Sequence, residues 1–155
     1  MFAQNVRVEG KEAMDFVSVR IITDNLDVMV EFYEKVTGVI ADRPAPVFAE
    51  LRFPSCTLAL GHTSTAALFN NAARPAANKT AIIEWVVDDV ESEYERLKPI
   101  VSAWEQQPTL MPWGNRSILF RDPDGNLVNL FTPATEEATM WCDQAGKPHA
   151  VLDWR

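Results

Sequence analysis

The chain has 155 residues, of which 47% are apolar and 23% are charged, a composition that suits one soluble domain with a sizeable core. Its formal net charge of -8 argues against a nucleic-acid partner, because phosphate binding needs clustered lysine and arginine side chains. No stretch is long and apolar enough to cross a bilayer, and residues 1–10 lack the apolar run of a secretory signal. We therefore expect a cytoplasmic protein that binds neither nucleic acid nor a membrane.

The first half of the chain predicts a strand, a helix and further strands. Residues 16–23 (FVSVRIIT) are rich in β-branched side chains and alternate between two faces, one of which holds Phe16, Ser18, Arg20 and Ile22. An apolar stripe at helical spacing follows, formed by Leu26, Val30 and Tyr33. Gly38 ends that helix. Residues 48–53 and 56–60 then predict two strands joined by a turn.

The second half repeats this order after a connection. Residues 63–80 are small and polar, and we expect them to link the halves and to hold a short helix near 66–70. Residues 81–87 predict a strand, and the helix that starts at Val90 stops at Pro99. Three further strands are predicted at 100–105, 117–121 and 127–132. The last two are joined by DPDGN, whose residues favour a tight turn.

The two halves align as an internal repeat. Ser18 aligns with Ile82 and Leu26 with Val90 at one common offset, and the closing strands align once the longer second turn is allowed for. The repeat predicts an α+β fold of two tandem βαβββ modules that form a curved mixed sheet around a cleft, with the helices outside. We expect one domain over 1–155, divided into module one at about 14–62, a linker at 63–80, module two at about 81–133 and a tail at 134–155. Trp141 and Trp154 suggest that the tail packs on the domain or on a partner subunit.

Three segments resemble a known family: NLDVMVEFYEKVTG, VVDDVESEYERLK and PWGNRSILFRDPDGNLVNLF. They resemble, in this order, the first helix with its glycine stop, the second strand-to-helix junction and the closing hairpin of the vicinal oxygen chelate superfamily. That superfamily includes glyoxalases, bleomycin resistance proteins and extradiol dioxygenases. The resemblance covers residues 16–133 and implies the doubled βαβββ fold. A duplicated ferredoxin-like fold would need a second helix in each half, and residues 38–60 offer none.

The resemblance also tests the chain for a metal site. Metal-dependent members hold a divalent ion with His, Glu or Gln side chains from four strands. Carried onto this chain by the resemblance, the ligand positions fall on Ser18, Ala59, Ile82 and Asn129. Two of these side chains have no donor atom, and the other two are weak neutral ligands. Of the two histidines, one ends a strand with the parity of the opposite face and the other lies in the tail: His62 and His149. The resemblance therefore implies a member without a metal or other cofactor, unless the strand register is shifted by one residue.

The predicted cleft face offers other candidates for ligand binding: Ser18, Arg20, Glu84, Trp113, Asn129 and Phe131. Arg20 and Glu84 are repeat equivalents, and one alternative is that they form a structural ion pair that closes the cleft. In the other alternative the pair is open, so that Arg20 holds a carboxylate or phosphate and Glu84 an amine. Trp113 either stacks on the ligand or plugs the barrel end. Phe48 and Arg52 are further candidates on the first-half side.

The favoured function is the binding of a small organic molecule, cationic or aromatic, as in bleomycin-resistance-like members, which are antibiotic-resistance proteins. The resemblance implies a homodimer whose subunits complete the cleft together, and no catalytic residue is assigned. The alternative is a metal-dependent lyase, isomerase or dioxygenase of the same superfamily, which needs Glu50, Glu84 and Asn129 to converge with water. A third hypothesis is a structural or regulatory dimer with a plugged cleft.

Overall fold

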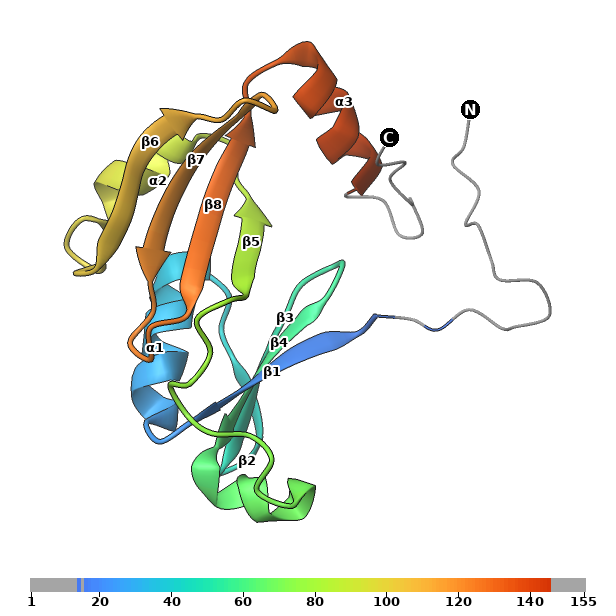
Figure 1. Ribbon diagram of the computed structural model, residues 1–155, viewed down its shortest axis with the longest axis vertical. Helices are drawn as coiled ribbons and strands as arrows, with labels where there is room; N and C mark the ends of the chain where they lie inside the picture. Colours follow the sequence, from blue (N-terminus) through green and yellow to red (C-terminus); the bar gives the residue numbers. More distant parts are fainter. Residues whose placement is uncertain (1–13, 15, 146–155) are drawn as a thin grey trace.

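The computed structural model describes residue 14 and residues 16–145 of the chain. They form two four-stranded sheets, and helices α1 and α2 lie along one side of the sheets (Figure 1). The first module consists of β1 Ser18–Thr23, α1 Leu26–Thr37, β2 Asp42–Ala45, β3 Phe48–Arg52 and β4 Thr57–His62. The short helix η1 Thr63–Phe69 leads to the second module, which consists of β5 Ile82–Val86, α2 Val90–Leu97, β6 Trp104–Leu110, β7 Asn115–Arg121 and β8 Leu127–Pro133. Helix α3 Glu136–Ala145 follows.

The two modules have the same strand order, β1-β4-β3-β2 in the first and β5-β8-β7-β6 in the second. The opening strand of each module lies parallel to its closing strand, and the other neighbours are antiparallel. This arrangement confirms the predicted α+β fold of two tandem βαβββ modules. The modules contribute separate sheets, and within the described residues β1 and β5 are edge strands with one strand neighbour each.

The helices are held at their ends by local hydrogen bonds. Gly38 adopts a left-handed conformation with φ of 72° and donates its backbone N–H to the carbonyl of Glu34, which ends α1. Asp89 caps α2, because its carboxylate accepts the backbone N–H groups of Glu91 and Ser92 at 3.0 and 3.4 Å. Hydrogen bonds from Ser92 lower the pKa of the Asp89 carboxyl group below its ordinary value.

The core lies between the helices and the sheets and runs through both modules. Apolar side chains from β3, β4, β7, β8 and both helices form one buried cluster. Rings of α1 reach module two, since Phe32 lies 6.2 Å from Phe120 and Tyr33 lies 6.0 Å from Trp85 between ring centroids. Trp104 belongs to this layer, because its ring contacts Phe120 with 5.4 Å between centroids.

A buried hydrogen bond also joins the modules. The Tyr33 hydroxyl donates to Asp122 in the β7–β8 turn at 2.6 Å. The same carboxylate accepts the backbone N–H groups of Asp124 and Asn126 and the side-chain amide of Asn126. Burial and the neighbouring carboxylate of Asp122 raise the pKa of Tyr33 well above its ordinary value, so the phenol stays protonated and remains a donor.

Two parts of the chain differ from the sequence predictions. The strand predicted at 100–105 is wrong, because Ile100 and Val101 both bond back to the Leu97 carbonyl and extend the turn after α2, so β6 begins at Trp104. The tail at 134–155, where no regular period was found, holds α3, while Trp154 and His149 lie outside the described residues. No helix in the described part of the chain is long and apolar enough to span a membrane.

Candidate functional site on the open faces

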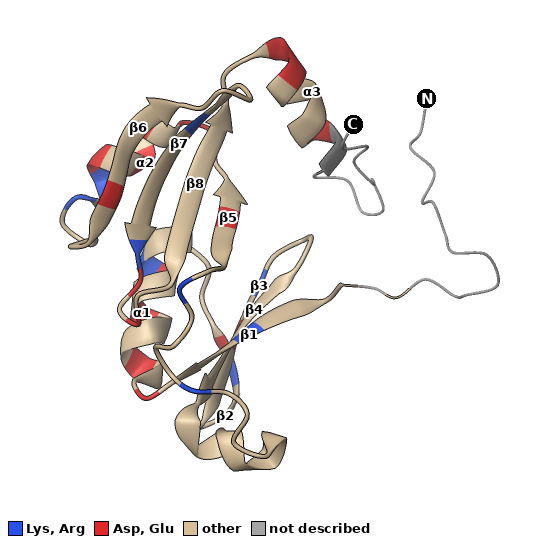
Figure 2. Cartoon of the chain, viewed as in Figure 1, with Lys and Arg blue, Asp and Glu red and all other residues tan. Residues whose placement is uncertain are grey.

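Each sheet has one face directed at α1 or α2 and a second face that these helices do not contact, which we call its open face. On the first sheet the open face includes Ser18, Arg20, Phe48, Glu50, Ala59 and Gly61. On the second sheet it includes Ile82, Glu84, Val86, Ser117, Asn129 and Phe131. Figure 2 shows that the acidic residues gather mainly on the helices and that the strands carry few charges. The open faces therefore carry few charged side chains.

The open face of module two carries a hydrogen-bonded polar pair. Glu84 on β5 lies beside Asn129 on β8 in the sheet register, and the Asn129 amide donates from Nδ2 to Oε2 of Glu84 at 2.6 Å. This contact fixes the orientation of the amide, because the reverse orientation would place two oxygens together. Asn129 is only 9% exposed, and its Oδ1 atom has no hydrogen-bond partner in the described structure. The pair therefore presents an acceptor that lacks a donor.

The open face of module one carries Arg20 in a different setting. The Arg20 guanidinium lies over two aromatic rings, with Cζ 4.9 Å from the centroid of Phe48 and 5.4 Å from that of Phe69. Arg20 and Glu84 form no ion pair with each other in the described structure, and each is held by a different partner. The alternative in which the two side chains form an ion pair that closes the cleft is therefore wrong, and binding of an anion by Arg20 and of an amine by Glu84 stays a prediction.

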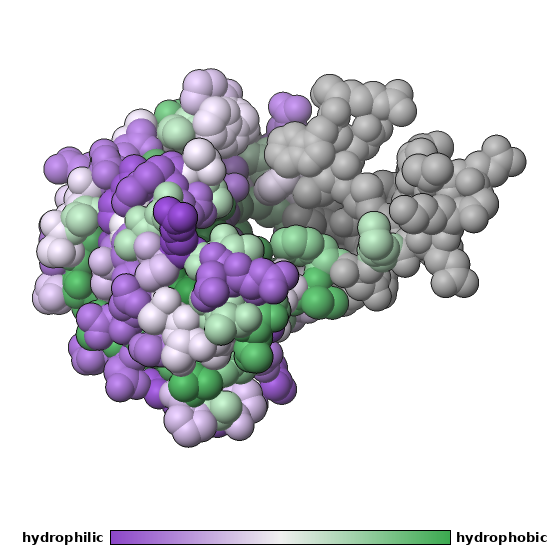
Figure 3. All heavy atoms as spheres, turned by 60° about the horizontal axis from the view of Figure 1, so that its bottom comes forward, coloured by the Kyte–Doolittle hydropathy of each residue, from purple (hydrophilic) through white to green (hydrophobic). Residues whose placement is uncertain are grey.

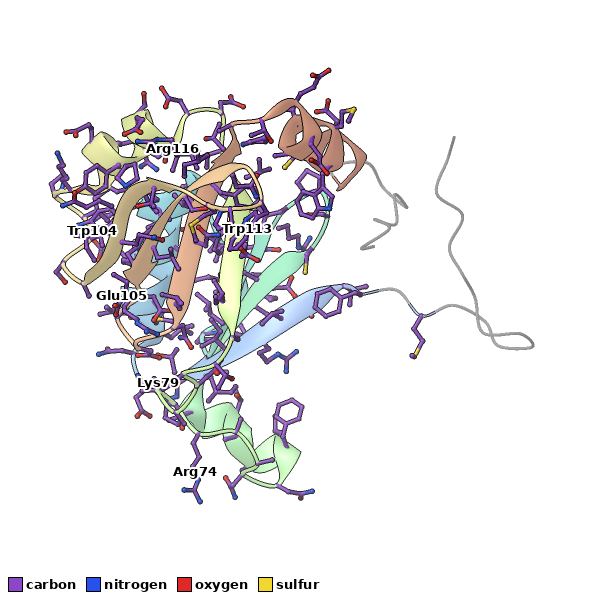
Figure 4. The ribbon with its side chains drawn as sticks, turned by 45° about the horizontal axis from the view of Figure 1, so that its top comes forward. Arg74, Lys79, Trp104, Glu105, Trp113 and Arg116 are labelled. Carbon is purple, nitrogen blue, oxygen red and sulfur yellow. The ribbon has the colours of Figure 1, made fainter. Side chains whose placement is uncertain are left out.

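The remaining predicted residues lie in different places. Ser18 is exposed at the start of β1, on the same face as Arg20. Phe131 follows Asn129 on the open face of β8 and is only 8% exposed, so its ring forms part of the wall. Trp113 lies in the β6–β7 turn and is 64% exposed (Figure 4). The structure thus brings Glu84, Asn129 and Phe131 together on one sheet, whereas Trp113 comes from a turn between strands.

A hollow adjoins Arg20 where the two modules meet. It has a volume of about 370 Å³ and is lined by the edge of β1, the linker after η1, the start of β5 and Asn126. A larger hollow of about 780 Å³ lies on the helix side, between the end of α1 and the start of α2. The smaller hollow borders Arg20 of the open face of module one, and the larger one borders Val86 of module two.

Phe69 is a contact that sequence reasoning missed. It lies in η1, within a linker predicted to be small and polar, and its ring reaches back to Arg20. The available signal was that Phe69 is the one aromatic residue in the segment 63–80. His62, the predicted strand-end histidine, is the last residue of β4 and caps η1, where its Nδ1 accepts the backbone N–H of Ser64 at 3.1 Å.

The residues on the open faces do not fit a divalent metal ion. No three His, Cys, Asp or Glu side chains of the described residues gather as a metal site. Glu50 is engaged by Arg52, whose Nη2 lies 2.7 Å from the Glu50 carboxylate, and Glu84 is engaged by Asn129. The side chains of Ala59 and Ile82, at two of the four expected ligand positions, offer hydrocarbon only. A hard or borderline cation needs several oxygen or nitrogen donors directed at one point, which this arrangement lacks.

Comparisons with known proteins agree with this fold. A family model described as Glyoxalase/Bleomycin resistance protein/Dioxygenase superfamily matches residues 15–130. Among solved structures, a glyoxalase/bleomycin resistance protein/dioxygenase from Nocardioides is similar, with 22% identity, a TM-score of 0.68 and coverage of 84% of this chain and 89% of that one.

Two further solved structures share the fold. A glyoxalase/bleomycin resistance protein/dioxygenase family enzyme from Burkholderia phytofirmans PsJN has 17% identity, a TM-score of 0.66 and coverage of 77% and 99%. A lactoylglutathione lyase from Agrobacterium tumefaciens has 22% identity, a TM-score of 0.61 and coverage of 79% and 96%. No curated protein sequence matches the chain. At these identities the likeness is one of fold, and the activities of these relatives do not transfer to this chain.

Proposed function

Because the chain belongs to the glyoxalase/bleomycin resistance protein/dioxygenase superfamily, we propose that it binds a small organic molecule on its open faces, without a resident catalytic metal. The ligand carries a cationic or hydrogen-bond-donating group that binds Glu84 and Asn129. The observation that carries this proposal is the unpartnered Oδ1 atom of Asn129, buried beside a carboxylate.

The chemistry of Glu84 and Asn129 favours a ligand that carries a hydrogen-bond donor. A buried amide oxygen without a hydrogen bond costs about 1–3 kcal/mol, so a ligand N–H or O–H group that reaches it gains binding energy. Glu84 adds a negative charge beside this oxygen, which favours an amine or amidine over a neutral donor. Apolar side chains flank the pair on β5, where Ile82 is 48% exposed and Val86 is 57% exposed. They suit the hydrocarbon part of an organic cation.

Titration with aromatic and aliphatic amines, followed by tryptophan fluorescence and calorimetry, tests this proposal. Glu84→Gln removes the charge but keeps the shape, and we expect it to weaken amine binding by about tenfold or more. Asn129→Leu removes the acceptor and has the same direction of effect. The matched control is Glu95→Gln, which removes an exposed carboxylate of α2 that is paired with Lys98. Equal affinities of Glu84→Gln and the unaltered chain would contradict the proposal.

Elemental analysis separates this proposal from a metal-dependent lyase, isomerase or dioxygenase. Protein purified without chelators and then soaked in zinc, iron, manganese and nickel salts should retain less than about a tenth of an equivalent of each metal. Near-stoichiometric retention would favour the enzyme instead.

We further propose that the protein acts as a cytoplasmic homodimer. Apolar side chains before and on β1 are exposed, including Phe16 at 75% and Val17 at 67%. Figure 3 shows hydrophilic residues over one side of the visible face and apolar residues gathered toward the other. Exposed apolar groups of this kind favour an interface between subunits. Light scattering with size-exclusion chromatography should give twice the mass of the chain, and Val17→Asp should shift the protein toward the monomer.

A further inference from the structure

We propose that Arg20 is the anion-binding group of the open faces, so that the ligand carries a carboxylate or phosphate in addition to its donor group. This inference deepens the proposed function and depends on it for its biological meaning. It rests on a different sheet and on different contacts, which are the two aromatic rings that hold an otherwise unpaired guanidinium.

The register of the first sheet lets Arg20 lie across its neighbours. Arg20 stands opposite Ala59 on β4, and Phe48 on β3 stands opposite Gly61. These small residues leave room above β4, and a Cβ atom added at Gly61 would lie 3.9 Å from Cδ of Arg20. The arginine side chain can therefore lie close to the surface of β4 and reach the Phe48 ring on β3. Its second aromatic contact, Phe69, comes from η1.

The aromatic rings attract the guanidinium but offer its N–H groups no oxygen or nitrogen acceptor. A ring face attracts the cation through its π electrons, whereas the N–H groups of a guanidinium lie in its own plane. No described residue accepts a hydrogen bond from Arg20. A planar set of N–H donors that is held in place and left unpaired matches the two oxygens of a carboxylate or phosphate.

The other basic side chains of the molecule show that the unpaired state of Arg20 is an exception. Most basic side chains in the described part of the chain form ion pairs, and the exceptions are Arg20, Arg74 and Lys79. Glu50, the acid on the open face two strands from Arg20, is engaged by Arg52 instead. With a net charge of -8, the chain as a whole repels anions, so an anion that binds must do so through a local site.

The two open faces then define the class of ligand. Arg20 and Glu84 occupy equivalent positions of the two modules and carry opposite charges, and neither is neutralised by an opposite charge in the described structure. A small molecule that satisfies both groups is amphoteric, with an acidic group for Arg20 and an amine or similar donor for Glu84.

Nuclear magnetic resonance titration of the full-length ¹⁵N-labelled chain tests the anion site directly. Sodium benzoate and inorganic phosphate are the two probes, added separately at constant ionic strength, and the arginine Nε–H signals are followed. We expect one of these signals, assigned by its loss in Arg20→Met, to shift and saturate. Arg20→Met should weaken binding of the probe by about tenfold or more. A stronger response to benzoate identifies a carboxylate ligand, and a stronger response to phosphate identifies a phosphate ligand.

Two further variants make the result specific. Arg116→Met is the matched control, because it removes an exposed guanidinium that is paired with Glu91 and lies outside that hollow, at the other end of the molecule from Arg74 in Figure 4. It should bind the probe within about twofold of the unaltered chain. Phe69→Leu keeps the guanidinium and removes one ring, and should weaken binding by about threefold.

The inference is overturned if neither probe gives a saturable shift, or if Arg116→Met loses as much affinity as Arg20→Met. The amine titrations described above use Glu84 and Asn129 and are read separately. Loss of amine binding with intact anion binding would therefore remove the proposed function and leave the site at Arg20 in place. The reverse result would remove this inference alone.

Discussion

The helix-facing side and the open face of the two modules differ in how well the internal repeat is kept. On the helix-facing side, Leu58 and Leu60 of β4 correspond to Val128 and Leu130 of β8, and all four are buried in one core. On the open face, Arg20 corresponds to Glu84 and Ala59 to Asn129. The core positions thus kept one chemistry in both modules, whereas the open positions became opposite in charge and unlike in polarity.

This difference separates the residues that the fold requires from those that it does not. Two equivalent helices need apolar partners on both sheets, because burial of hydrocarbon is what holds each helix in place. Nothing in that requirement selects an arginine at one position and a glutamate at its equivalent. Leaving Asn129 Oδ1 buried without a partner even opposes folding. Residues that do not assist folding are the ones that we assign to the ligand.

The largest expected effect on stability comes from a substitution in the core on the helix-facing side. Leu60→Ala removes a fully buried side chain of β4 and should lower the free energy of unfolding by about 2–5 kcal/mol. The matched open-face variant is Glu84→Gln, which should change the free energy of unfolding by less than about 0.5 kcal/mol. Urea denaturation of both variants measures this difference. Similar losses for the two would show that the open face is also part of the folding core.

The second effect concerns the hydrogen bond that joins the modules on the helix-facing side. Tyr33→Phe removes a buried donor from Asp122 and should lower the free energy of unfolding by about 1–3 kcal/mol. Tyr94→Phe is the control, because the Tyr94 hydroxyl makes no hydrogen bond in the described structure while its ring packs on Trp104. Equal unfolding midpoints for Tyr33→Phe and the unaltered chain would contradict a stabilising role of this hydrogen bond between the modules.

The same contrast explains how far the sequence could predict the molecule. The helix-facing side follows from periodicity, because apolar residues at fixed spacings have one way to be buried together. The repeat therefore predicted the α+β modules, while local glycine and turn residues predicted the end of α1 at Gly38 and the turn before β8. The strand predicted at 100–105 was wrong because Ile100 and Val101 lie in the turn after α2, and their apolar side chains pack on the core from that turn.

The open face was predicted less completely. Parity along the strands was sufficient to place Arg20, Glu84 and Asn129 on it. Parity gives no information on how far a side chain reaches, so the choice between an Arg20–Glu84 pair and an open site needed the structure. Phe69 could not be placed from the sequence, because its position depends on how a linker of irregular structure folds back.

The smallest expected effect lies at the module junction and depends on pH. Asp124 follows Asp122 in the β7–β8 turn, and its Oδ2 atom is buried without a hydrogen-bond partner in the described structure. Burial raises the pKa of the Asp124 carboxyl group above its ordinary value; the charges of Asp122 and Asp24 add to this, while a hydrogen bond from Thr23 opposes it. The folded chain therefore holds this proton more tightly than the unfolded chain, and the contribution of Asp124 to stability falls as pH rises from the unfolded pKa, about 3.9, through the folded one.

It follows that Asp124→Asn should stabilise the protein where the carboxylate is ionised and should have no effect where it is protonated in both states. At pH 7 we expect a rise in Tm of about 1–3 °C, which should disappear near about pH 3. Asp88→Asn, which changes an exposed acid before α2, is the control and should show no such trend. Calorimetric scans across this pH range give the comparison. If Asp124→Asn lowers Tm at pH 7, the hydrogen bond from Thr23 to the ionised carboxylate outweighs the burial of its charge. In that event Asp124 would stabilise the junction of the two modules as Asp122 does, and its unpartnered oxygen would not indicate a cost.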